Sequence, residues 1–573
     1  MLRPASILPT LAGSAALCAA LCGCGPAPGA TAADAPAAGP DRPAGRVFFR
    51  DVTAAWGVDF ESSQRFTAEY PIAEIMGHGL ALFDADGDGV PDLYLADAGP
   101  HRDDRAPDRF YRGRAGGGFE DATASSGLGH DGWSTGVAAG DIDNDGDLDL
   151  YVGAWGPDRL FRNDGGGRFT DVTEAAGIAG DHLTTSIAFV DVDADGFLDI
   201  FVVHYVVHDP DRVCGGIGGG REFCAPGAYA PALDTLYRNR GDGTFEDVSE
   251  AAGIASQAAS GLGVAVADLT RDGLVDVYVA NDQMPNHLWA RQEDGTFRDV
   301  AIATGAALSG RGNAQASMGV DVADVDGNGP FDIFVTHLAG EGSTLYMADE
   351  HGIFTDATTR SGIGALSREY TAFGTAFVDL DLDGALDLLV ANGRVSRGDR
   401  LPGADAAGEF ALYAEPNQVL VNAGRGRVRD DTHPDEPFCA PVEVTRGLAV
   451  ADLDGDGDLD AVVSNIAGPV RVYENGAERR GAWLRVVARD PALRREVVGV
   501  RVVVRAGGRV LARPAGGGWS YMSASVGGAH FGLGAARTFD EIEVVWPDGS
   551  VETFPGGAAD REVVVLRGGG SRR

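Results

Sequence analysis

Carboxylates recur at a fixed spacing in one short segment of the chain, Asp452-Leu-Asp-Gly-Asp-Gly-Asp-Leu-Asp460, where positions 1, 3, 5 and 9 are all Asp. Calcium takes roughly six to eight oxygen ligands at about 2.3 to 2.6 Å, and a short loop supplies them by turning alternate side chains inward. Gly457, at position 6, permits the sharp turn that brings the carbonyl of position 7 to the ion. The segment therefore predicts a calcium-binding loop.

The residues after this loop distinguish it from an EF-hand. Leu459 and the run Ala461-Val-Val463 are apolar and favour a strand. An EF-hand needs a Glu at position 12 of its loop and a helix after it. The chain is therefore expected to leave the loop as a β-strand.

The loop occurs seven times, which predicts up to seven calcium ions. The residues at positions 1, 3, 5 and 9 are Asp84, Asp86, Asp88 and Asp92; Asp141, Asp143, Asp145 and Asp149; Asp191, Asp193, Asp195 and Asp199; Asp268, Thr270, Asp272 and Asp276; Asp324, Asp326, Asn328 and Asp332; Asp379, Asp381, Asp383 and Asp387; and Asp452, Asp454, Asp456 and Asp460. Thr270 and Asn328 replace carboxylates with neutral oxygens, so we expect weaker binding there. For a single loop the alternative is a solvated acidic turn; seven copies beside matching strands favour calcium.

Length and composition indicate a repeat protein made of strands. A chain of 573 residues is too long for one ordinary core, and 84 glycines with short apolar runs favour an all-β fold. A net charge of −39 alone would favour a disordered chain, but 44% of the residues are hydrophobic, which is enough to fill a core. Because nucleic-acid affinity comes from Lys and Arg that neutralise phosphates, we expect no nucleic-acid partner.

The N-terminal residues indicate export. Residues 1–24 have Arg3 and a short apolar stretch, and they end in Leu21-Cys22-Gly23-Cys24, which resembles a lipobox. The resemblance implies that Cys24 carries a lipid and, with Gly25 after it, that the protein is an outer membrane lipoprotein or lies at the cell surface. Periplasmic or secreted protein is the alternative. Residues 25–46 are rich in Ala, Pro and Gly and are expected to form a disordered tether, so that only the lipid contacts the membrane.

Two further phrases repeat with the loops and define a unit. Phe49-Arg-Asp-Val-Thr53 is echoed after each of the first six loops, and Leu160-Phe-Arg-Asn163 is typical of the strand that precedes it. Each unit reads as strand, calcium loop, strand, strand, glycine turn and strand, which is one four-stranded blade of a β-propeller. The last unit lacks the phrase of residues 49–53, so we expect the N-terminal strand to complete the seventh blade and remove the exposed edges.

A small residue stands five positions before each first Asp of a loop. These residues are Gly79, Gly136, Ser186, Gly263, Gly319, Gly374 and Gly447. In a propeller the innermost strands converge on the axis, so there is little room there for side chains.

The repeats resemble the FG-GAP/VCBS repeats of the integrin α-subunit propeller class. Residues 481–573 resemble the ASPIC/UnbV domain through Trp483-Leu-Arg-Val486, His530-Phe-Gly-Leu-Gly534 and Val544-Val-Trp-Pro-Asp-Gly549. Together the two parts resemble the bacterial branch of the cartilage acidic protein family. The resemblance implies a seven-bladed β-propeller over residues 47–480, followed by a small C-terminal β-sandwich-like domain.

The resemblance to integrin propellers also implies a ligand rim on the face opposite the calcium loops. Its expected residues are Asp97, Trp155, His204, Asn281, His337, Asn392 and Asn465. The alternative is that Asn and Asp at strand ends only form turns. Cys214 and Cys224 are expected to form a disulfide in an exported protein, and Cys439 to be a buried thiol.

No catalytic motif of the serine-hydrolase or zinc-protease kind occurs in the mature sequence, and no enzymatic activity is expected. The first hypothesis is a lipid-anchored, calcium-stabilised propeller that binds an extracellular or periplasmic protein or glycan. The alternatives are a propeller hydrolase or lyase that acts on polysaccharide, and a purely architectural protein of the envelope or matrix.

Overall fold

The computed structural model describes residues 46–67, 69–99, 106–209, 211–216, 220–478, 481–516 and 518–572. The expected signal peptide, Cys24 with its expected lipid, and all but the last residue of the expected tether lie outside the described residues. Within the described ranges, no helix combines the length and the apolar character needed to cross a membrane.

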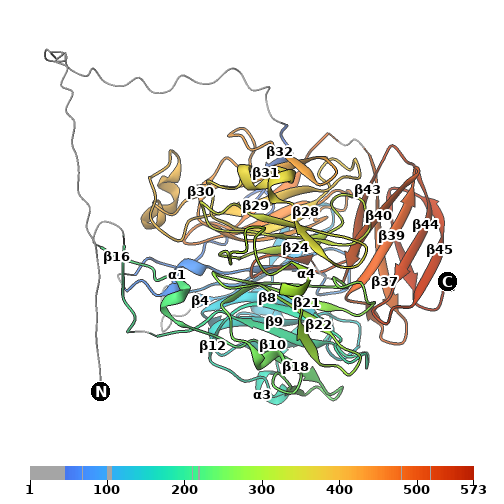
Figure 1. The fold of residues 1–573 in the computed structure, drawn as a ribbon, viewed down its shortest axis with the longest axis horizontal. Coiled ribbons are helices and arrows are strands. Elements are labelled where there is room, and N and C mark those ends of the chain that lie inside the picture. The colour runs from blue at the N-terminus through green and yellow to red at the C-terminus, as the bar shows by residue number, and fades with distance from the viewer. Residues whose placement is uncertain are drawn as a thin grey trace, which may run out of the picture. The chain divides into compact units, whose positions relative to one another are not determined.

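Seven sets of four antiparallel strands carry the acidic loops between their first and second strands. The strands are β2 (Leu80–Phe83), β3 (Asp92–Leu95), β5 (Arg109–Gly113) and β6 (Phe119–Asp121); β8 (Ser134–Gly140), β9 (Asp149–Gly156), β10 (Arg159–Asn163) and β11 (Phe169–Asp171); β12 (His182–Val190), β13 (Asp199–His204), β18 (Thr235–Asn239) and β19 (Phe245–Asp247); β20 (Gly261–Ala267), β21 (Asp276–Asn281), β22 (His287–Arg291) and β23 (Phe297–Asp299); β24 (Val320–Ala323), β25 (Asp332–Val335), β26 (Thr344–Ala348) and β27 (Phe354–Asp356); β28 (Ala372–Val378), β29 (Asp387–Asn392), β31 (Gln418–Gly424) and β32 (Arg427–Asp430); and β34 (Thr445–Ala451), β35 (Asp460–Asn465), β36 (Arg471–Asn475) and β1 (Phe49–Asp51). Figure 1 labels β8, β9 and β10 of one set and β28, β29 and β31 of another. The all-β prediction is confirmed, and the number of sets fits the expected seven blades.

The N-terminal strand completes the last set. β1 pairs antiparallel with β36, with Phe49 opposite Asn475 and Asp51 opposite Tyr473. The innermost strands contact one another in the order β2, β8, β12, β20, β24, β28 and β34, and β34 returns to β2. The ring is therefore closed in the way that the order of the repeated phrases predicts.

The outer strands end in short helical turns, and the repeated FxDVT phrase forms each turn. In β11, Asp171 Oδ1 accepts hydrogen bonds from the amide of Thr173 at 3.0 Å and from its hydroxyl at 2.6 Å. The hydroxyl oxygen in turn accepts the amide of Leu160 at 2.9 Å. These turns are α2 (Thr123–Ser126), α3 (Thr173–Ala176), α4 (Ala301–Thr304) and α5 (Thr358–Ser361).

Shorter elements lie in the connections. They are α1 (Ile72–Met76), β4 (Ala106–Pro107), β7 (Asp131–Gly132), β14 (Val206–Val207), β15 (Cys214–Gly215), β16 (Arg221–Glu222), η1 (Pro226–Ala228), β17 (Ala230–Pro231), η2 (Ile254–Ser256), α6 (Ile363–Leu366), η3 (Ala404–Phe410), β30 (Glu415–Pro416) and β33 (Val442–Glu443).

The C-terminal region forms two sheets around one core. In the first sheet β37 (Ala482–Asp490) pairs with β38 (Arg495–Glu496), β43 (Ala529–Gly534) and β46 (Arg561–Leu566); the second has the order β40 (Arg509–Ala515), β39 (Val500–Ala506), β44 (Thr538–Val545), β45 (Val551–Ala558) and β47 (Ser571–Arg572). Leu484 and Phe531 of the first sheet and Val502 and Val544 of the second belong to one buried cluster. The expected sandwich-like domain is present.

One segment leaves this domain and enters the centre of the ring. Between β41 (Gly518–Trp519) and the end of β42 (Ala524–Ser525), residues 520–525 form what we call the axial segment. β42 pairs in parallel with the inner strand β2. Tyr521 and Met522 are fully buried. Nothing in the sequence pattern predicted that a C-terminal segment fills the axis.

The axial segment is hydrogen-bonded to five inner strands. The Ser520 hydroxyl accepts the Thr375 amide at 2.9 Å, and the Met522 carbonyl accepts the Val137 amide at 3.0 Å. The hydroxyls of Ser523 and Ser525 accept the amides of Leu80 and Val450, and the Ser186 hydroxyl accepts the Met522 amide; these distances are 3.2, 3.0 and 3.2 Å. The segment therefore binds the ring on nearly all sides.

The axial segment partly explains why the inner strands have small residues. A Cβ atom on Gly79 would lie 1.7 Å from the Met522 carbonyl oxygen, and one on Gly447 would lie 2.6 Å from the Ser523 hydroxyl. Neighbouring blades also approach closely at the axis, since a Cβ on Gly319 would lie 2.0 Å from the carbonyl oxygen of Phe373 in the next blade. The predicted crowding at the axis is confirmed.

Candidate metal loops and the opposite face

The acidic loops bring their carboxylates together. In at least five of the seven loops, oxygens of three Asp side chains lie within 4.8 Å of one another. These groups are Asp84, Asp86 and Asp92; Asp141, Asp143 and Asp149; Asp191, Asp193 and Asp199; Asp324, Asp326 and Asp332; and Asp379, Asp381 and Asp383. The spacing that predicts a cation site therefore produces convergent oxygens.

The first Asp of each loop organises the turn. Asp452 Oδ1 accepts the Gly455 amide at 2.8 Å, and its Oδ2 accepts the Gly457 amide at 3.0 Å. Gly457 has φ of 95°, a conformation that is strained for any residue with a Cβ. The turn expected at position 6 is therefore present, and Asp452 holds it.

The ninth residue ties the loop to the third strand of its own blade. Asp460 Oδ2 accepts the Leu453 amide at 2.8 Å, and Oδ1 accepts the Asn475 amide at 2.7 Å. The equivalent Asp in each of the other six loops makes the same pair of contacts. Because a carboxylate oxygen has two lone pairs, this role leaves acceptor capacity for an ion.

A repeated Asn links neighbouring loops, a role that sequence reasoning missed. Asn163 Nδ2 donates to Leu148 O within its own loop at 3.1 Å and to Ala85 O in the preceding loop at 2.7 Å. Asn239 and Asn475 reach the preceding loop in the same way, through Ile142 O and Leu380 O. The signal was available in the repeated Arg-Asn of the third strand.

Burial and mutual repulsion raise the pKa values of the loop carboxylates. Burial is the main cause, and neighbouring loop carboxylates add to it, raising the pKa of Asp460 to about 9 and that of Asp332 to about 8. At the first position, burial raises the pKa of Asp141 to about 6. Such carboxylates hold a proton near neutral pH unless a cation replaces it.

The donor set fits a hard cation. Asp191 Oδ1, Asp268 Oδ1 and Thr270 Oγ1 are buried and have no hydrogen-bond partner among the described residues. In the loop with Asn328, the amide nitrogen donates to Ala348 O at 2.9 Å, which leaves the side-chain oxygen available as a ligand. Carboxylate, amide, hydroxyl and carbonyl oxygens are the ligands that calcium prefers.

The loop that begins at Asp379 also has positively charged neighbours. Arg46 forms an ion pair with Asp381. The Arg513 guanidinium lies near Asp379 and acts to lower its pKa, although burial wins and the value is raised to about 7. This loop therefore has part of its charge neutralised by the protein itself.

Side chains of the C-terminal domain contact five of the loops. Arg495 reaches two of them, with Nε donating to Asn144 Oδ1 at 2.9 Å and Nη2 to Gly196 O at 3.0 Å. Arg501 donates to Gly329 O at 2.9 Å, Arg509 to Asp383 O at 2.7 Å, and His530 Nε2 lies 3.0 Å from Gly457 O. The domain therefore covers the loop face by binding loop carbonyls. The sequence did not predict that these arginines and His530 contact the loops, because no repeated motif includes them.

The expected ligand rim is buried. Asp97, Trp155, His204, Asn281, His337, Asn392 and Asn465 are all at most 8% exposed. Several of their polar atoms bond to nearby protein groups: Asn281 Nδ2 donates to Pro285 O at 2.8 Å, and His337 Nε2 lies 3.0 Å from the Thr344 hydroxyl. Asn281 Oδ1 and Asn392 Oδ1 are buried without a hydrogen-bond partner among the described residues. The structure corrects the interpretation of an open rim, because these side chains are buried against nearby backbone and side chains.

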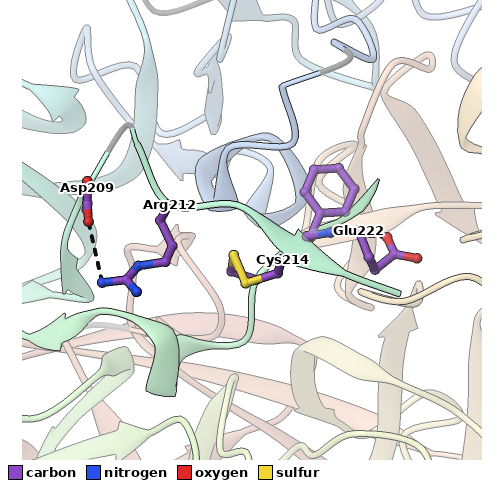
Figure 2. Close-up of a disulfide and its surroundings, with 6 residues drawn as sticks. Asp209, Arg212, Cys214 and Glu222 are labelled. Carbon is purple, nitrogen blue, oxygen red and sulfur yellow. Dashed lines mark hydrogen bonds and ion pairs between the residues drawn. A yellow bond between two sulfur atoms is a disulfide. The ribbon is translucent and has the colours of Figure 1, made fainter. Parts of the chain in front are cut away.

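The cysteines lie as expected. Cys214 of β15 and Cys224 form a disulfide, which links the two sides of the β15–β16 hairpin that contains Glu222 (Figure 2). Close to this hairpin, Arg212 forms an ion pair with Asp209 at 3.4 Å. Cys439 is a buried free thiol, and burial raises its pKa well above the ordinary value. A raised pKa disfavours the thiolate, so Cys439 is unsuited to act as a nucleophile.

Comparison with protein families accounts for both parts of the chain. The FG-GAP-like repeat family matches residues 84–152, 149–202, 210–279 and 268–335, and the ASPIC and UnbV family matches residues 491–572. The chain combines FG-GAP-like repeats with an ASPIC/UnbV domain. The FG-GAP-like match includes the five acidic loops that begin at Asp84, Asp141, Asp191, Asp268 and Asp324, and the loop-contacting side chains of Arg495, Arg501, Arg509 and His530 lie in the ASPIC and UnbV match.

About half of the chain is similar in sequence to cartilage acidic protein 1. The chain is 28% identical to cartilage acidic protein 1 of Xenopus tropicalis over 306 residues, which are 51% of this chain and 42% of that protein. It is 27% identical to the Homo sapiens protein over 323 residues, 55% of this chain and 44% of that protein. The match spans less than half the length of these relatives.

Two solved structures show a distant likeness. One is a lectin of Agrocybe aegerita that recognises non-reducing terminal N-acetylglucosamine, with TM-score 0.39, 17% identity and coverage of 69% of this chain and 86% of that chain. The other is the BP39L lectin of Burkholderia pseudomallei, with TM-score 0.41, 12% identity and coverage of 70% and 97%. Likenesses at this level carry no inference about what the FG-GAP-like repeats bind.

Proposed function

We propose that this protein is an exported, calcium-stabilised binding module that recognises a protein or glycan, held at the cell envelope by a lipid on Cys24. The observation that carries the proposal is the set of loops in which convergent, buried carboxylates lie beneath the ASPIC/UnbV domain. Up to seven calcium ions would relieve the repulsion within the loops and so stabilise the blades. The metal has a structural role, and the partner binds elsewhere.

Calcium is favoured over other ions by the donor set. The loops offer oxygen ligands, whereas zinc sites use Cys and His. Magnesium requires a near-ideal octahedron and keeps several waters, which suits a crowded loop of side chains less well. Extracellular calcium modules bind at about 10⁻⁴ to 10⁻³ M, an affinity that an exported protein could use.

The partner is expected on the face opposite the loops. Arg495, Arg501, Arg509 and His530 occupy the loop face, and the axial segment fills the centre of the ring. The opposite face has the insertions, which include α1, the disulfide hairpin and η3. Irregular insertions on a rigid scaffold are common binding elements.

A thermal melt tests the calcium part of the proposal. A soluble form without residues 1–24 is heated with excess chelator, with calcium and with magnesium. We expect the unfolding midpoint to rise saturably with calcium alone, because an ion at about 100 times its Kd stabilises one site by about 2.7 kcal/mol. A midpoint that is the same in calcium and in chelator would contradict a structural calcium role.

Fractionation tests the lipid anchor. The full-length protein and its Cys24→Ser variant are expressed in a Gram-negative host and separated into membrane and soluble fractions. We expect the protein in the membrane fraction and the variant in the soluble or secreted fraction. Equal release of both would favour plain secretion.

A further inference from the structure

A pocket of about 210 Å³ lies among the insertions on the face opposite the metal loops. Its walls are apolar and come from three places: Ile72, Ile75 and Met76 of α1, Phe223 beside the disulfide, and the blade residues Met318 and Phe373. The exposed residues Gln283 and Ser396 also line it, so the pocket opens to solvent between them. The space suits one small ligand or a single side chain.

One carboxylate lines this apolar pocket and is only half satisfied. Asp282 is 7% exposed. Its Oδ2 accepts a hydrogen bond from the Tyr205 hydroxyl at 2.6 Å. Its Oδ1 is buried and has no hydrogen-bond donor among the described residues. A buried carboxylate oxygen without a donor loses its hydration without replacement, which favours a ligand that supplies a donor.

The charges around Asp282 also favour a positively charged ligand. Burial, together with the negative charge of Glu341, raises the pKa of Asp282 to about 7. Glu341 is exposed to solvent and accepts the Ala316 amide at 2.9 Å. In the described part of the chain Asp282 has no ion pair, so a cation from a ligand would be its first.

The pocket wall is held in place before any ligand arrives. Arg446 donates to the Ile75 carbonyl through Nε at 3.0 Å and Nη2 at 2.8 Å, which fixes α1. The Tyr413 hydroxyl donates to Glu222 Oε1 at 2.6 Å, which joins the disulfide hairpin to the segment after η3. A preformed pocket avoids the entropic cost of ordering loops on binding.

We propose that this pocket binds a primary ammonium group on an apolar stem, carried either by a small aliphatic amine or by a lysine side chain of a partner. The ammonium donates to Asp282 Oδ1 while the stem packs against the wall of α1 and Phe373. A guanidinium fits less well, because it pairs with both oxygens of a carboxylate and Tyr205 already uses Oδ2. The inference rests on the proposed binding function and names the chemistry of its ligand.

The experiment measures binding of n-pentylamine, n-pentanol and pentanoate to the calcium-loaded chain by ligand-observed NMR. We expect pentylamine to bind roughly ten times more tightly than pentanol, the range for a charge-assisted hydrogen bond, and pentanoate not to bind. A blocked Gly-Lys-Gly peptide and its norleucine counterpart distinguish the source: preference for the lysine peptide over pentylamine assigns a partner side chain, and the reverse assigns a free amine. Equal binding of pentylamine and pentanol would overturn the proposal.

Asp282→Asn and Asp234→Asn form a matched pair of variants. Both residues are 7% exposed, but Asp234 accepts the His204 amide and does not line the pocket. We expect Asp282→Asn to lose about tenfold in pentylamine affinity with pentanol unchanged, and Asp234→Asn to bind both as the parent does. Similar loss in both variants would overturn the assignment.

Leu338→Trp is a second variant that does not depend on replacing a buried charge. Leu338 is partly exposed and lines the pocket, so the larger ring is expected to fill it and to abolish binding of both pentylamine and pentanol. Unchanged pentylamine binding in this variant would overturn the pocket assignment. If calcium raises the unfolding midpoint but pentylamine does not bind, the pocket inference fails and the proposal of a calcium-stabilised module stands. If pentylamine binds but calcium does not change the midpoint, the pocket inference stands and the calcium proposal fails.

Discussion

Three buried histidines on different blades and on the C-terminal domain are kept neutral by their surroundings. Burial lowers the pKa of His204 to about 3 and those of His337 and His530 to about 4. His337 lies between the Ala316 carbonyl and the Thr344 hydroxyl, at 3.2 and 3.0 Å. Neutral imidazole suits these partners, whereas a buried imidazolium would lack a counter-charge.

The lowered pKa of His337 predicts how the free energy of unfolding changes at acid pH. Its pKa is about 4 in the folded protein and 6.5 ordinarily, so the unfolded chain binds the extra proton between these values. The contribution of His337 is therefore complete above pH 6.5 and falls by about 3 kcal/mol as the pH drops to 4. We expect His337→Gln to flatten that part of the curve of unfolding free energy, measured by urea denaturation against pH.

The exposed His351→Gln variant is the matched control for this measurement. An identical pH slope in the parent and in His337→Gln between pH 6.5 and 4 would show that His337 is not kept neutral by burial.

At the scale of the element, the residues of each acidic loop have different structural roles according to their position. The first and ninth residues hold the turn and tie it to the third strand through backbone amides, as Asp452 and Asp460 do. In at least four loops the side-chain oxygens of positions 1, 3 and 9 converge. If calcium binds there, we expect position 5 to add a further side-chain oxygen and position 7 to offer only its carbonyl. Replacing different carboxylates of one loop should therefore have different consequences.

Asp145→Ala and Asp147→Ala separate these roles, since they stand at positions 5 and 7 of one loop. Asp145 is an expected ligand, while the side chain of Asp147 is partly exposed and outside the expected ligand set. We expect Asp145→Ala to bind one calcium ion fewer, counted by isothermal titration calorimetry, and Asp147→Ala to keep the parent number. A full count in Asp145→Ala would argue that this loop is an acidic turn without an ion.

For the whole molecule, the ring and the C-terminal domain share a core through the axial segment. Tyr521 is fully buried, donates to the Met76 carbonyl at 3.0 Å and packs edge-on to Phe373 at 4.8 Å. The domain also binds the loop carbonyls on the same ring. Two regions connected by a buried segment and by many hydrogen bonds should unfold together.

Tyr521→Ala tests this coupling. Truncation of a fully buried aromatic costs roughly 3–5 kcal/mol, so we expect a lower unfolding midpoint and increased hydrogen exchange in both β20 and β39, followed by mass spectrometry. Val564→Ala, at a position that is 45% exposed on β46, is the control and should change little. Increased exchange in only one of the two strands would mean that the regions unfold independently.

Local features of this fold could be predicted from the sequence, and distant contacts could not. The loops, the four-stranded unit and the pairing of β1 with β36 follow from spacing and from the order of repeated phrases. The contact of Met522 with Ser186 and the hydrogen bond of Arg501 to Gly329 join residues that no periodicity relates. The burial of His337 depends on contacts with Ala316 and Thr344, which no motif of the sequence marks.

Because β1 pairs with β36, the seventh blade can form only after β36 has been synthesised. Asn475, the partner of Phe49, is synthesised more than 400 residues after it. Until β36 is made the seventh blade stays open, so a chain cut short before β36 would leave two sheet edges exposed. Closing the ring therefore requires the chain through β36, and shorter fragments are expected to aggregate or be degraded.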